Sequence, residues 1–136
     1  MNKVGMQTIK FDKPPVITSV ASIVGPKESE GPLASFFDQC LEDEFWGEST
    51  WEKAESKIIK ETVNTAIAKS GISQANIDYC FAGDLLNQCI SSGFGLRDVN
   101  IPFFRSFWSM FYFCRKYEYW CNLRRIFCKK CNMCYF

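Results

Sequence analysis

Hydrophobic residues recur at helical spacing over one long segment of the chain, residues 49–70. The apolar positions of this segment that share one helical face are Trp51, Ala54, Ile58, Val63, Ala66 and Ile67. Ser49 and Glu52 have the spacing of a capping box, and Gly71 stands where a left-handed C-cap would end the helix. The pattern predicts an amphipathic helix whose apolar face belongs to the core.

Shorter apolar runs bounded by Gly, Pro and Asp lie on both sides of that helix. Residues 16–24, 79–82 and 103–104 are rich in β-branched or aromatic residues, which is typical of buried strands. Residues 33–40 and 85–96 carry apolar side chains at helical spacing and predict two further helices. Because strands and helices alternate with short connections, the pattern predicts an α/β fold of parallel strands with covering helices.

The composition changes sharply near residue 104. The last 32 residues contain no Gly, Pro, Ala, Val, Asp, Thr or Gln and are dominated by Phe, Tyr, Trp, Cys, Lys and Arg. We therefore divide the chain into residues 1–104, part of an α/β domain, and residues 105–136, a tail without its own fold.

Charge and composition exclude several classes of function. Lys plus Arg is 16 and Asp plus Glu is 15, so the balance does not indicate a nucleic-acid-binding protein. His is absent, which excludes a Ser-His-Asp or Cys-His mechanism within this chain. The sequence shows no secretory signal and no apolar run of about 18 residues, so we expect a cytosolic or peripheral protein.

Cysteines crowd the tail. Cys128, Cys131 and Cys134 are spaced as in an iron–sulfur or zinc ligand run, with Cys121 upstream. The tail lacks turn residues that would wrap a metal, and structural zinc ligands usually come in two separate pairs. We therefore expect no metal and no cofactor, and keep a cysteine-rich metal-binding tail as an alternative.

Polar residues follow the predicted strand 79–82. Asp84, Asn87 and Gln88 would place a carboxylate and two amides at the carboxyl end of that strand, where open α/β sheets bind ligands. The alternative is that Asp84 caps the next helix and that both amides are surface groups. The residues alone leave the two interpretations open.

Several runs of residues 3–104 carry a resemblance to a known family. The specific ones are Gly25-Pro26-Lys27-Glu28-Ser29-Glu30-Gly31-Pro32-Leu33 and Ala82-Gly83-Asp84-Leu85-Leu86-Asn87-Gln88, supported by Trp51-Glu52-Lys53-Ala54-Glu55, Asn76-Ile77-Asp78 and Ile101-Pro102-Phe103. Together they resemble the stage V sporulation protein AD family, of which they cover only the first part.

The resemblance implies a thiolase-like fold, of which this chain would be an incomplete N-terminal half with an irregular, non-native tail. It implies a sporulation protein, not an enzyme, that binds dipicolinic acid and supports its uptake into the developing spore. Partners would be other proteins of the same operon at the spore's inner membrane, and full-length members would form homodimers. By the same resemblance, Asp84, Leu85, Asn87 and Gln88 would bind the ligand.

A thiolase-fold acyltransferase is the alternative class, because relatives of that fold transfer acyl groups through a Cys nucleophile. The family carries Gly-Ala-Cys-Ser-Thr shortly after the Ile-Pro-Phe strand, whereas residues 104–112 here read Phe-Arg-Ser-Phe-Trp-Ser-Met-Phe-Tyr. With neither that Cys nor any His, catalysis is not expected.

The genetic code explains this departure. Trp and Met each have one codon, so reading each codon one base later makes Trp108-Ser109 give Gly and Met110-Phe111 give Cys. Permitted codons elsewhere give Leu-Gly-Leu-Phe-Gly-Ala-Cys-Ser-Thr over residues 104–112, which contains the family motif. We therefore hypothesise a frameshift near residue 104 and a truncated, impaired copy of the family protein.

Overall fold

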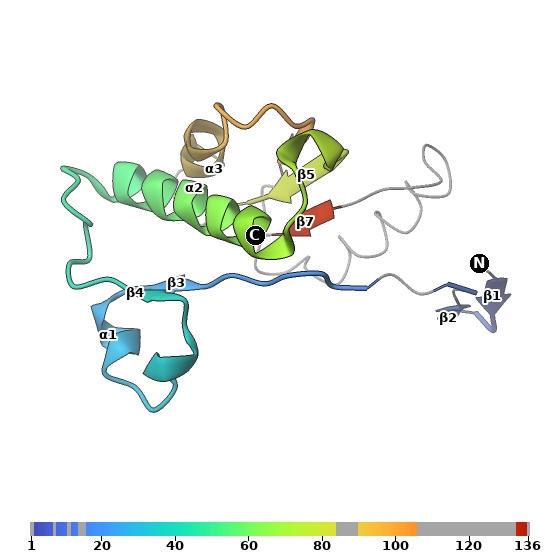
Figure 1. Cartoon of the computed structure of the whole chain (residues 1–136), viewed down its shortest axis with the longest axis horizontal. Helices are drawn as coiled ribbons and strands as arrows, with labels where there is room; N and C mark the ends of the chain where they lie inside the picture. The colour runs from blue at the N-terminus through green and yellow to red at the C-terminus, as the bar shows by residue number, and fades with distance from the viewer. Residues whose placement is uncertain are drawn as a thin grey trace.

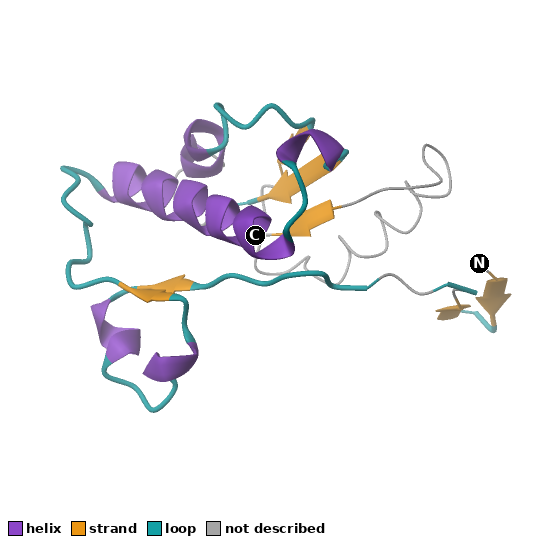
Figure 2. Cartoon of the chain, viewed as in Figure 1, coloured by secondary structure: helices purple, strands orange, loops and turns teal. Residues whose placement is uncertain are grey.

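The computed structural model describes residues 2–6, 8–10, 12–13, 16–83, 90–105 and 133–135. In this part of the chain, one long helix lies across short strands, with a small lobe below it (Figures 1 and 2). The elements in chain order are β1 (Asn2–Val4), β2 (Thr8–Lys10), β3 (Ile23–Val24), α1 (Pro26–Ser29), the 3₁₀ helix η1 (Ala34–Phe36), β4 (Gln39–Cys40), α2 (Trp51–Ser70), the 3₁₀ helix η2 (Gln74–Asn76), β5 (Tyr79–Ala82), α3 (Ile90–Gly95), β6 (Phe103–Arg105) and β7 (Met133–Tyr135).

The largest described sheet has three parallel strands in the order β6-β5-β7. In its register Cys80 lies opposite Phe103 on one side and Cys134 on the other. The parallel pairing of β5 with β6 confirms the predicted strands at 79–82 and 103–104. The mixed α/β class with parallel strands is therefore confirmed.

Two smaller sheets lie outside this one. Strands β1 and β2 form an antiparallel hairpin, and the turn between them includes Gly5 at φ +69°, a left-handed conformation that glycine adopts without strain. Strands β3 and β4 pair in parallel and enclose a lobe, residues 25–40, that contains α1 and η1. In Figure 1 this lobe projects from one side of α2.

The core lies between α2, α3 and the inner face of the three-stranded sheet. Its buried members are Val63, Ile77, Cys80, Ala82, Leu96 and Ile101. Burial alternates along β5, since Cys80 and Ala82 are 1% exposed while Tyr79 and Phe81 are only half-buried. The alternation follows from the two-residue period of a strand, which turns one face toward the helices.

Helix α2 confirms the predicted helix, with a correction at its start. Thr50, not Ser49, is the N-cap, and its Oγ1 accepts a hydrogen bond from the Lys53 backbone N at 3.4 Å. Gly71 ends the helix at φ +66°, as predicted. Trp51 was expected on the core face but is 50% exposed, because it is the first helical residue and its ring lies against Phe45 of the preceding turn.

Two sequence predictions were wrong. Residues 16–24 were expected to form a buried strand, but only Ile23–Val24 is a strand, and Val16 is 82% exposed. Within the described ranges no strand pairs with residues 16–22. These residues therefore have neither the backbone pairing nor the burial that was predicted for them. Residues 33–40 were expected to be helical, but they form η1 and then β4, because backbone pairing with β3 competes with the helix.

The structure describes only a small part of the tail. Residues 106–132 and 136 lie outside the described residues, whereas Met133–Tyr135 forms β7 beside β5. Of the predicted helix at 85–96, the described part is α3. No helix within the described ranges combines the length and the apolarity that crossing a membrane requires.

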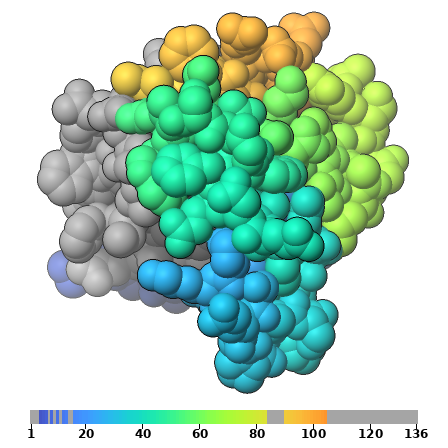
Figure 3. All heavy atoms as spheres, turned by 90° about the vertical axis from the view of Figure 1, so that its left-hand side faces the viewer, coloured from blue at the N-terminus to red at the C-terminus, as the bar shows by residue number. Residues whose placement is uncertain are grey.

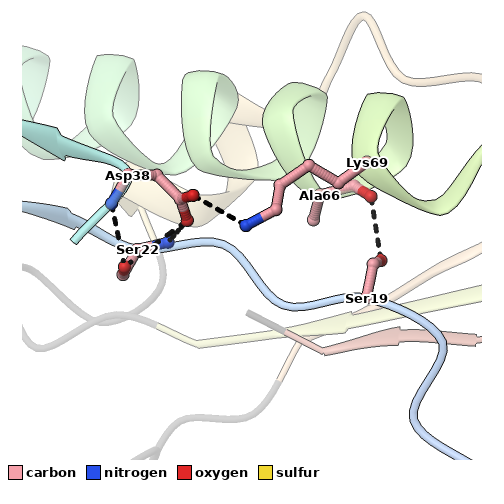
Figure 4. A network of polar contacts seen from close by, with 5 residues as sticks. All are labelled: Ser19, Ser22, Asp38, Ala66 and Lys69. Carbon is pink, nitrogen blue, oxygen red and sulfur yellow. Dashed lines mark hydrogen bonds and ion pairs between the residues drawn. The ribbon is translucent and has the colours of Figure 1, made fainter. Parts of the chain in front are cut away.

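A small polar network fixes the lobe against α2 (Figure 4). Asp38 Oδ2 accepts a hydrogen bond from the Ser22 backbone N at 2.9 Å, and Asp38 Oδ1 lies 2.7 Å from Lys69 Nζ on the helix. Ser19 Oγ donates to the Ala66 carbonyl at 2.9 Å. Ser19 is thus held against the last turns of α2, at a residue 47 positions later in the chain, and Ser22 is linked to the same turns through Asp38.

Candidate functional site

The carboxyl edge of the three-stranded sheet is the place where the sequence predicts a ligand. Strand β5 ends at Ala82, which lies opposite Arg105 of β6 in the parallel register, and Gly83 follows directly. Because parallel strands end at the same edge, Ala82 and Arg105 both lie at the carboxyl edge of the sheet. In open α/β sheets ligands bind at this edge, which is the reason for the prediction.

The predicted ligand-binding residues Asp84, Leu85, Asn87 and Gln88 lie outside the described residues. Their segment, residues 84–89, is bounded by Gly83 on one side and by Ile90, the first residue of α3, on the other. The ligand-binding role of these four residues therefore stays a prediction.

Small residues allow α3 to approach α2 closely. Ser91 and Ser92 are both 0% exposed, and Gly95 is also buried. A Cβ added at Gly95 would lie 2.6 Å from the backbone oxygen of Ser56 on α2, so only glycine fits there without a shift of the backbone. The end of the 84–89 segment is therefore joined to a helix that is packed tightly against the core.

Ser91 is a residue that the sequence analysis missed. Its Oγ is buried and has no hydrogen-bond partner among the described residues. A buried hydroxyl without a partner is unfavourable by about 1–3 kcal/mol, which makes this group a candidate donor for something bound beside it. The only sequence signal was a pair of serines inside a predicted helix, where an apolar residue would be more usual.

The outer face of the sheet is aromatic. The rings of Phe81 and Phe104 stack with centroids 5.2 Å apart, and Tyr79 lies 5.7 Å from the same Phe104 ring. Phe104 is 44% exposed. These rings stiffen the pair of strands that ends at the candidate site, on the face opposite α2.

The carboxyl groups with shifted pKa values in the described part of the chain serve structural contacts. The pKa of Asp98 is lowered mainly by its hydrogen bond to Lys60, and the pKa of Asp43 is lowered by the backbone N–H groups of Gly47 and Phe45. Each contact holds the carboxylate ionised, so these two groups are not suited to general acid catalysis.

Metal ligation was kept as an alternative because of the tail cysteines. In residues 2–6, 8–10, 12–13, 16–83, 90–105 and 133–135 no three His, Cys, Asp or Glu side chains gather into a potential metal site. Cys114, Cys121, Cys128 and Cys131 lie outside the described residues, and Cys134 is placed only as a backbone position in β7.

Two comparisons of this sequence with known proteins lead to the same family. A sequence model of the family described as "Stage V sporulation protein AD (SpoVAD)" matches residues 5–114. The stage V sporulation protein AD of Bacillus subtilis (strain 168) is 37% identical over 103 residues, which are 76% of this chain. The same alignment covers 30% of the Bacillus protein, so the chain spans less than a third of that relative's length.

Proposed function

Because this chain belongs to the stage V sporulation protein AD family, we propose that it serves sporulation by binding dipicolinic acid at the loop that follows β5. The observation that carries the proposal is the family match over residues 5–114, which includes the Gly83-to-Gln88 run that follows β5 in the sequence. In this role the protein supports dipicolinic acid uptake into the developing spore, together with other proteins of the same operon at the spore membrane.

The chemistry of the loop suits a small planar dianion. The side-chain amides of Asn87 and Gln88 offer N–H donors, and Ser91 offers the buried hydroxyl that has no partner among the described residues. Leu85 supplies an apolar contact for the flat ring. Asp84 completes the predicted set of ligand-binding residues.

Titration calorimetry tests the proposal with the full chain. We expect saturable binding of dipicolinate, and each of Asn87→Ala and Gln88→Ala removes one hydrogen bond, which weakens binding by roughly three- to tenfold. Gln39→Ala is the matched control, since Gln39 is an exposed amide on β4. Binding of acyl-coenzyme A with no response to dipicolinate would instead favour an acyltransferase relative.

Ser91→Ala separates a ligand-binding role from a structural one. If Ser91 Oγ donates only to the ligand, its removal weakens dipicolinate binding several-fold and leaves the melting temperature unchanged or raised, because a buried group without a partner disappears. A lower melting temperature with unchanged affinity would contradict this role.

We also propose that the chain is the first part of a thiolase-like half whose reading frame shifts near residue 104. The change of composition at that position and the codons of Trp108 and Met110 support the shift. Sequencing the gene tests this directly: one inserted or deleted base near codon 104 is expected to open a long frame containing Gly-Ala-Cys-Ser-Thr, and a frame that stays closed after either change contradicts it.

A further inference from the structure

We draw no further inference here: the strongest candidate, the exposed side chains of Leu33 and Phe36 on the lobe of residues 25–40 that projects from the molecule in Figure 3, carries nothing, because no contact within the described part of the chain shows what covers them.

Discussion

Asp38 connects the lobe to α2 with one carboxylate oxygen and to the segment before β3 with the other. One oxygen accepts the Ser22 backbone N–H, and the other pairs with Lys69 at 2.7 Å. The pKa of Asp38 is lowered, first by the hydrogen bond from Lys69 and then by that from Ser22. A lowered pKa means that the folded state favours the ionised form, so the contact adds stability only while Asp38 is ionised.

The pH dependence follows from the sign of this shift. The contribution of Asp38 is present in full above its usual pKa of 3.8 and is lost as the pH falls through the lower value of the folded state. We expect Asp38→Asn and Lys69→Met each to lower the midpoint of thermal unfolding at pH 7, measured by helical circular dichroism. The gap to the wild type should shrink below pH 3.8.

The double variant controls for unrelated effects of either substitution. If Asp38 and Lys69 act on each other, the combined loss at pH 7 is smaller than the sum of the two single losses. Strict additivity, or a gap that stays constant down to pH 2, would contradict the role given to this pair.

At the scale of elements, the contact between α2 and α3 depends on the absence of a side chain at one position. A Cβ at Gly95 would lie 2.6 Å from the Ser56 backbone oxygen, and a backbone atom cannot turn aside as a flexible side chain can. We expect Gly95→Ala to destabilise the fold by about 1–3 kcal/mol, measured by urea denaturation. Because α3 follows the segment proposed to bind the ligand, the variant should also weaken dipicolinate binding.

Gly25→Ala is the matched control for that substitution. Gly25 has φ −78°, and a Cβ there meets nothing within 4 Å, so alanine is expected to be neutral or slightly stabilising. Equal destabilisation by both variants would show that loss of a glycine, and not the crowding between α2 and α3, is responsible.

The sequence predicted the elements that depend on their own residues. The helix α2 has an apolar face, a capping residue within one position of the prediction and Gly71 at its end, and all of these are local signals. Strand β5 was likewise predicted from its apolar run between a short connection and Gly83.

The elements that depend on distant partners were not predicted. Residues 33–40 carry a helical pattern, yet Gln39–Cys40 pairs with Ile23–Val24, a contact that no local pattern encodes. The candidate site was predicted only as a place at the end of β5. The buried hydroxyl of Ser91 was missed because burial between two helices depends on where α3 packs.

At the scale of the whole molecule, the described part has a modest core. Its buried hydrophobic residues are Leu41, Ala54, Val63, Ala66, Ile77, Cys80, Ala82, Leu96 and Ile101, several of which are small. Large apolar side chains such as Val16, Ile17 and Val20 are mostly exposed. We expect a shallow thermal transition and binding of a dye that reports exposed apolar surface. A sharp transition without dye binding would contradict this expectation.

We propose that this member of the stage V sporulation protein AD family binds dipicolinic acid through the loop after β5, and the rest of the account depends on this proposal. Equilibrium dialysis of the full chain against pyridine-2,6-dicarboxylate and its 3,5-isomer, which has the same charge and size, tests the claim most directly. Saturable binding of the 2,6-isomer, at least about tenfold tighter than that of the 3,5-isomer, is the predicted result. Equal retention of both isomers, or retention of neither, would contradict the account.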